Sequence, residues 1–443
     1  MTTSLTHGFA VAIATAKPSE EAIVAARLAI LDLLACALGG ADDRSTGLLV
    51  ETLRAGIGPS VLIGRSGRAD PFTAALVNGH SGHVLDYDDV HASVRGHPTV
   101  VILPALLALA GTHPVAARDL IAAYIVGLEA MARLGLALGA RHYETGFHAT
   151  ATLGPVGAAA AVAHLLRLHP DTIAVALGLA ATQSAGLRLQ FGTDAKPLHA
   201  GLAARAGLTA ACLAQAGLSG APAFLDGPIG FLDAFGFGAT APDRLLAGWG
   251  EPWQILTPGL TLKAFPCCTA AHPVAVGALA LREADALRAE AVDSVALTFP
   301  PGGDAALVVS RPTTGIEARF SPEYVFAAAL TDGALGIGHF DERPVRPDLA
   351  VLAARVSRRH DEAAPRLSAD PATRFVVLDV TLRDGRHMSR RIEGLPGLTD
   401  AREKFRDATG GAEIFSGIPD LVARMDDDAD LARLLALLGQ SRS

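Results

Sequence analysis

The sequence is poor in cysteine and in charged residues, and both shortages disfavour certain classes of function. Its 443 residues include four cysteines, none of which form a Cys-x-x-Cys pair, so a zinc site or iron–sulfur cluster held by this chain alone is disfavoured. Charged residues make up 19% of the chain, and a net charge of −8 argues against a general nucleic-acid surface. An anionic ligand would have to be attracted by a local cluster.

Long uninterrupted hydrophobic runs are also missing. Half of the residues are hydrophobic, yet charge, Gly or Pro interrupts the apolar runs before they reach the roughly 20 residues of a membrane span. The opening segment, MTTSLTHGFAVAIATAKPSEE, has no basic region ahead of its short apolar run and does not resemble a secretory signal. We therefore expect a globular, cytoplasmic protein that binds neither membranes nor nucleic acid.

Helical patterns dominate the first 257 residues. The first of these helices is expected to begin after Ser19, a good N-cap, and to stop at Gly39-Gly40. Similar patterns cover residues 103–111, 117–138, 150–166, 172–185 and 199–216. Ala and Gly are dense in several of them, which allows helices to approach closely. These patterns predict a large, tightly packed, all-helical domain.

The pattern of residues changes after the first 257 residues. Two stretches rich in β-branched residues, 292–300 and 373–382, predict strands, and the Asp-Gly pair at 384–385 predicts a hairpin turn. Helical periodicity returns at 399–407 and 428–438, so the C-terminal segment can pack back onto the first domain. The expected fold class is mainly α, with a smaller α+β domain.

Residues 78–100, NGHSGHVLDYDDVHASVRGHPTV, concentrate polar groups in this apolar chain. The stretch contains His80, His83, His91, His97, Asp86, Asp88, Asp89 and Arg95. If residues 78–90 are partly helical, His80 and His83 are spaced i, i+3, as are Asp86 and Asp89, with Asp88 turned away. Such a set suits a divalent ion, but the ligand spacing is incomplete, so we expect no metal and keep a metal-dependent hydrolase as a less favoured alternative.

A second interpretation is acid–base chemistry on an anion. His97-Pro98 opens a helix, and three other segments also place basic residues just before one. These are GFHATATLG with His148 and the possible cap Thr150, AKPLHAGLAARAG with Lys196 and His199, and LKAFPCCTAAHP with Lys263 and His272. Each taken singly has a structural explanation as a cap or a core histidine. Four occurrences favour convergence on an anion, which helix N-termini attract.

Together with FSPEYVFAAALTDG (320–333), these motifs resemble the MmgE/PrpD family, which contains 2-methylcitrate dehydratase and cis-aconitate decarboxylase. The resemblance runs over nearly the whole chain. It implies a helical domain over 1–257 completed by 398–443, an α+β lid domain over 258–397, a homodimer, and an active site at the domain junction without a cofactor or metal. The resemblance implies five catalytic candidates, which are Asp86, His97, His148, His272 and Tyr324. It also implies three substrate-binding candidates, which are Arg95, Lys196 and Lys263.

The resemblance also implies a small di- or tricarboxylate substrate. The two lysines would pair with its carboxylates. His97 or His148 would move a proton near neutral pH. Asp86 would orient a histidine or act as a base, and Tyr324 would donate a proton or hydrogen bond. A lyase, either dehydratase or decarboxylase, is therefore the first expectation.

An epimerase acting on a dicarboxylate such as iminodisuccinate is the second expectation. Arg95-Gly96-His97 and Phe191-Gly192-Thr193 resemble that branch of the family, whereas Tyr324 resembles the lyase branches. A non-catalytic binding or structural protein is disfavoured, because a scaffold does not need so many polar breaks before its helices.

Overall fold

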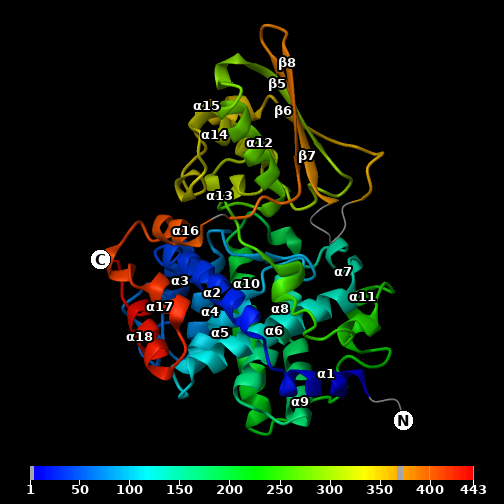
Figure 1. Ribbon diagram of the computed structural model, residues 1–443, viewed down its shortest axis with the longest axis vertical. Helices are drawn as coiled ribbons and strands as arrows, with labels where there is room; N and C mark the ends of the chain where they lie inside the picture. Colours follow the sequence, from blue (N-terminus) through cyan, green and yellow to red (C-terminus); the bar gives the residue numbers. More distant parts are fainter. Residues whose placement is uncertain (1–3, 367–372, 399, 443) are drawn as a thin grey trace.

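The chain forms two unequal bodies (Figure 1). A computed structural model describes residues 4–366, 373–398 and 400–442. The larger body consists of helices, and the smaller body packs helices against a four-stranded sheet. This arrangement confirms the expected fold class, mainly α with a smaller α+β part.

The helical body is built around alanine-rich helices. Its N-terminal helices are α1 (Leu5–Thr15), α2 (Glu20–Gly39), α3 (Arg44–Thr52), α4 (Pro71–His83), α5 (Thr99–Ala110), α6 (Ala117–Leu138), α7 (Arg141–Glu144), α8 (Ala149–Leu165), α9 (Pro170–Ala181), α10 (Ala195–Gln215) and α11 (Phe231–Gly236). Helices α4 and α10 touch through glycines, since a Cβ on Gly201 would lie 2.2 Å from the Leu76 carbonyl oxygen. This close approach brings the C-terminal end of α4 toward the first turn of α10.

The C-terminal helices pack back onto this body (Figure 1). They are α16 (Ala401–Ala408), α17 (Ile418–Arg424) and α18 (Asp428–Leu438). Their buried side chains share one hydrophobic cluster with residues between 9 and 255, and a second cluster spans residues between 267 and 382. The boundary expected at 257/258 falls between the two clusters. Position 399 of the expected helix 399–407 lies outside the described residues.

The smaller body contains a mixed sheet in the order β6-β5-β7-β8. Strand β5 (Val292–Phe299) runs parallel to β6 (Val356–His360) and antiparallel to β7 (Phe375–Leu382), which continues through a hairpin into β8 (His387–Glu393). The helices of this body are α12 (His272–Glu283), α13 (Gly315–Ala318), α14 (Pro322–Asp332) and α15 (Pro347–Ala353). The stretches expected to form strands therefore lie side by side as β5 and β7.

Two helices, α2 and α6, are long and apolar enough to cross a membrane by length and composition alone. In the fold, 72% and 89% of their apolar windows are buried, as in the core helices of a folded domain. The charges that interrupt them are paired inside the protein, Asp32 with Lys404 and Glu129 with Arg133.

Candidate active site

A cavity of about 400 Å³ lies between the two bodies and is lined by residues of both. Six of the eight expected site residues line it: Asp86, Arg95, His97, His148, Lys196 and Lys263. Its volume is in the range of cavities that hold small ligands.

The polar loop that forms one wall of the cavity is not helical beyond α4. Helix α4 ends at His83, and Asp86 adopts a left-handed backbone conformation with φ of 49°. The expected i, i+3 pairing of Asp86 with Asp89 on a helix was therefore wrong. A short strand pair, β3 (Val90–His91) with β4 (Leu260–Thr261), brings the segment that carries Lys263 beside this loop.

Asp86 holds two lysines in the wall of the cavity. Its Oδ1 accepts hydrogen bonds from Lys196 Nζ at 2.7 Å and Lys263 Nζ at 2.8 Å, and its backbone oxygen accepts a second from Lys263 at 2.7 Å. Burial alone would raise the pKa of Asp86, but the two ammonium groups outweigh it and lower that pKa. Asp86 is therefore ionised and better suited to placing the lysines than to accepting a proton.

Each of these two lysines keeps one N–H free of protein partners among the described residues. Lys196 donates one hydrogen bond to Asp86 and one to His83 Nε2, at 3.0 Å. Lys263 donates two hydrogen bonds, both to Asp86. Because an ammonium group has three donors, one remains on each lysine for a ligand oxygen.

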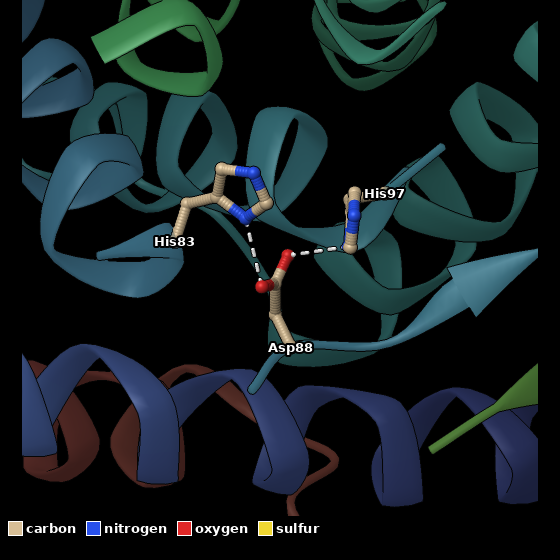
Figure 2. Close-up of side chains that lie close together, drawn as sticks. All are labelled: His83, Asp88 and His97. Atoms are coloured by element: carbon tan, nitrogen blue, oxygen red, sulfur yellow. Dashed lines mark hydrogen bonds and ion pairs between the residues drawn. The ribbon is translucent and has the colours of Figure 1, made fainter. Parts of the chain in front are cut away.

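Asp88 contacts two histidines at once, one through a hydrogen bond and the other at ion-pair distance (Figure 2). Its Oδ1 lies 2.8 Å from His83 Nδ1 and its Oδ2 lies 3.2 Å from His97 Nδ1. The carboxylate has no exposed surface, and burial is outweighed by the two imidazoles, which lower the pKa of Asp88. Asp88 was expected to turn away from the i, i+3 pairs of a helix; the chain leaves the helix before this residue, and Asp88 contacts His83, a member of one of those pairs.

The hydrogen bonds of His97 fix which nitrogen can take a proton. Its Nδ1 lies 2.8 Å from the backbone oxygen of Asp89, and a carbonyl oxygen only accepts, so Nδ1 carries the hydrogen. Nε2 is then the free basic nitrogen on the opposite edge of a ring that lines the cavity. Burial lowers the pKa of His97, with Asp88 acting in the opposite sense, so the neutral form is available at neutral pH.

His83, Asp88 and His97 also meet the spacing of a metal site, since one donor atom from each lies within 4.8 Å of the others. Two contacts disfavour a cation there. The Nδ1 hydrogen of His97 is committed to a carbonyl oxygen, and the Lys196 ammonium lies 3.0 Å from His83 Nε2. The cluster is better described as a carboxylate that hydrogen-bonds His83 and lies at ion-pair distance from His97, whose ring is held by the Asp89 carbonyl.

The segments around His148 and Lys196 differ from expectation in detail. Thr150 does not cap α8; its Oγ1 accepts a hydrogen bond from the backbone N–H of His97, and His148 itself occupies the N-cap position. Lys196 and His199 lie inside the start of α10 instead of before it. His148 Nδ1 lies 3.1 Å from His199 Nδ1, and burial lowers the pKa of His148 well below its usual range.

Two expected site residues are not among the residues that line the cavity. The Tyr324 hydroxyl donates to the backbone oxygen of His339 at 2.7 Å, inside the smaller body, and burial raises its pKa to about 12. His272 opens α12 with Nε2 directed to the backbone oxygen of Cys267 at 3.3 Å, and burial lowers its pKa to about 3. Neither side chain hydrogen-bonds to the two lysines among the described residues, although Lys263 helps to lower the pKa of His272.

Several residues around the site were missed by sequence reasoning. Lys404 on α16 pairs with Asp32 and donates to the backbone oxygen of Tyr87, and Arg319 donates to the backbone oxygens of Val84 and Phe340. One signal was available for Lys404. The chain has four lysines among 37 basic residues, and three of the four are buried around this loop. A rare lysine in an arginine-rich chain marks a position that needs a compact cation.

Fold and site together define a mainly helical protein with a smaller α+β body and a buried cluster of lysines, carboxylates and histidines at a cavity between the two. The chain belongs to the MmgE/PrpD family. The MmgE/PrpD N-terminal domain matches residues 6–242, and the C-terminal domain matches residues 265–411. These matches confirm the resemblance inferred from the motifs.

Curated relatives of this chain include several proteins named cis-aconitate decarboxylase. The protein from Mus musculus is 31% identical over 360 residues, covering 76% of this chain and 72% of the relative. The protein from Homo sapiens is 31% identical over 359 residues, covering 76% and 73%. The protein from Aspergillus terreus is 28% identical over 465 residues, covering 96% and 93%.

Proposed function

We propose that this protein is a lyase that acts on a small di- or tricarboxylate through proton transfer next to a carboxylate. The observation that carries the proposal is the arrangement of Asp86, Lys196 and Lys263, in which two ammonium groups each keep a donor free beside the imidazole of His97. Ammonium groups at this position stabilise a substrate carboxylate and the negative charge that spreads onto it during reaction.

The same residues serve either kind of lyase reaction. In a dehydration, His97 Nε2 removes the proton next to a carboxylate, the electron pair forms the carbon–carbon double bond, and hydroxide leaves with a proton as water. In a decarboxylation, the carbon–carbon bond to a carboxylate breaks, carbon dioxide leaves, and the electron pair left on carbon takes a proton from the His97 imidazolium. Lys196 and Lys263 would neutralise the charge that develops in both cases.

The names of the relatives support the decarboxylase branch and make cis-aconitate the first compound to test. Epimerisation of a dicarboxylate is the second candidate. Arg95, whose motif resembles the epimerase branch, lines the cavity, whereas Tyr324, whose motif resembles the lyase branches, does not. The placement of Tyr324 weakens one reason for preferring a lyase, and the comparisons supply a separate one.

The deciding experiment is to incubate the protein with cis-aconitate, 2-methylcitrate, citrate and iminodisuccinate in deuterated water and follow the products by NMR. We expect either carbon dioxide release with deuterium at the carbon that is protonated, or loss of water with formation of a carbon–carbon double bond. Deuterium exchange without net conversion would favour the epimerase. If none of the compounds reacts or exchanges, the proposed substrate class is wrong.

A further inference from the structure

The cavity carries an excess of positive charge that the lysine pair does not explain. Six of its lining residues are Lys or Arg and two are Asp or Glu, in a chain whose net charge is −8. Four of the six are arginines: Arg95, Arg188, Arg366 and Arg374. Arginine stays charged and presents a planar set of donors that fits a carboxylate.

Arg188 and Arg374 approach the cavity from different domains. Arg188 precedes α10 in the helical body, and Arg374 stands directly before β7 in the smaller body. Their Nη1 atoms make long bonds to neighbouring backbone oxygens, Arg188 to Ala305 at 3.3 Å and Arg374 to Gly303 at 3.5 Å. Both guanidinium groups are therefore tied to the same short segment of the smaller body.

Neither arginine has a carboxylate partner among the described residues, and the Nε of each is buried without a hydrogen-bond acceptor there. Other partly buried arginines of the smaller body differ, as Arg358 is held by both oxygens of Glu323 at 2.5 and 2.7 Å. Burial lowers the pKa of Arg374, as expected for a cation removed from water without an ion pair. These donors are oriented but not satisfied.

The arginine pair and the lysine pair are held by different parts of the cavity wall. Arg188 and Arg374 donate to the backbone oxygens of Ala305 and Gly303, whereas Lys196 and Lys263 donate to Asp86. Arg188 is stacked over the Tyr143 ring, with its guanidinium carbon 4.2 Å from the ring centre, which fixes its plane. The two pairs therefore act on different parts of a ligand.

We propose that Arg188 and Arg374 form a second carboxylate-binding subsite, so that the ligand is an elongated anion with a carboxylate at each end. One end lies at Lys196 and Lys263, where the reaction takes place, and the other end is held between the two domains. This proposal rests on the proposed function for the reacting end only. The arginine subsite selects the length of the substrate.

The test uses binding of unreactive dicarboxylates of increasing length, measured by calorimetry on the full-length chain. Malonate, succinate, glutarate and adipate differ only in the separation of their carboxylates. In the unmodified protein we expect affinity to rise with length until the second carboxylate reaches the arginines. In Arg374→Met and Arg188→Met, affinity for the longer compounds should fall about 10- to 100-fold, while malonate changes less than about threefold.

Matched variants separate the subsite from general effects of charge. Arg386→Met removes an exposed arginine beside the hairpin of the same sheet and should leave the series unchanged. Arg374→Lys keeps the charge without the planar fork and should recover part of the affinity. Each variant is first compared with the unmodified protein by circular dichroism. Arg188→Met and Arg374→Met change different domains, so the test still works if one of them misfolds.

The outcomes distinguish this proposal from the proposed function. An equal loss for malonate and for the longest compound, or no loss at all, overturns the arginine subsite. If length-dependent binding is lost in the arginine variants but no carboxylate is turned over, the subsite stands and the lyase proposal fails. If the unmodified protein binds none of the series, the arginine subsite is overturned, and the lyase proposal is decided by the turnover experiment alone.

Discussion

Two buried lysine–aspartate arrangements lie close together in this protein, and they differ in what their ammonium groups leave unbonded. Lys404 places its three donors on Asp32 at 2.6 Å and on the backbone oxygens of Tyr87 and Lys263 at 2.6 and 3.4 Å. Lys196 and Lys263 share one carboxylate, Asp86, and each retains a donor. The saturated lysine joins parts of the fold, whereas the unsaturated ones face the cavity.

The carboxylates alone would not reveal this difference. Asp32 and Asp86 both leave Oδ2 without a partner among the described residues. What separates the two arrangements is the cavity, which is lined by Asp86, Lys196 and Lys263 but not by Asp32 or Lys404. A buried ion pair therefore indicates function here only where its donors are incompletely used and open onto space for a ligand.

The largest effect should come from breaking the saturated pair. Lys404→Met leaves Asp32 buried without its cation, and removing one partner of such a pair costs about 3–5 kcal/mol in the free energy of unfolding. Urea or thermal unfolding measures this loss. The double variant Asp32→Leu with Lys404→Met should recover a substantial part of it, because no buried charge remains. Equal stability of Lys404→Met and the unmodified protein would contradict a structural role for the pair.

Removing an unsaturated lysine should affect activity more than stability. In Lys196→Met, Asp86 keeps its bonds to Lys263, so the carboxylate stays paired. The loss of the donor that faces the substrate should lower kcat/KM roughly 100- to 1,000-fold. Lys17→Met, which removes an exposed lysine, is the matched control. A large drop in unfolding free energy without a drop in kcat/KM would mean that Lys196 has a structural role, as Lys404 does.

Replacing Asp88 tests whether its charge beside the two imidazoles matters for catalysis at the cavity. Asp88→Asn keeps the shape of the side chain but removes the charge that both Nδ1 atoms meet. We expect kcat to fall about 100-fold with a smaller change in KM, because the substrate does not contact Asp88. Steady-state kinetics measure this separation. A change confined to KM would argue that Asp88 shapes the pocket and does not position His97.

The pH dependence gives a smaller and more specific test of the same contact. Burial lowers the pKa of His97 below its usual value of 6.5, and Asp88 opposes that shift because an anion favours the imidazolium. Asp88→Asn removes the opposing charge, so the limb of the pH profile that reports His97 should move to lower pH. It is the acid limb if His97 removes a proton, and the alkaline limb if it donates one. An unmoved profile would exclude His97 as the titrating group.

The sequence predicted the elements well because helix periodicity is local. The run 117–138 coincides with α6, and 150–166 differs from α8 by one residue at each end. Six of the eight expected site residues line the cavity; five of them lie in polar breaks between helices, and Lys196 lies in the first turn of α10. The conformation of Asp86 and the double contact of Asp88 had no such signal. Both depend on where α4 ends and on which segments pack against the loop.

Contacts between distant segments account for the rest of what was missed. Lys404 meets Asp32 across 372 positions, and Arg188 and Arg374 come from separate domains. No spacing rule in a single sequence links such residues. Their partnership appears only once the C-terminal helices have packed back and the smaller body lines one side of the cavity.

The smallest effect is expected at Tyr324, which the family resemblance placed among the catalytic residues. Its hydroxyl donates to the backbone oxygen of His339 at 2.7 Å and lies apart from the lining of the cavity. Tyr324→Phe should therefore cost about 1 kcal/mol of stability through the lost hydrogen bond and change kcat less than about threefold. Steady-state rates and thermal unfolding measure both. A loss of 100-fold or more in kcat would mean that the smaller body moves during turnover and carries Tyr324 to the lysines, and the contrast between bonded and free polar groups would then hold only for the unliganded protein.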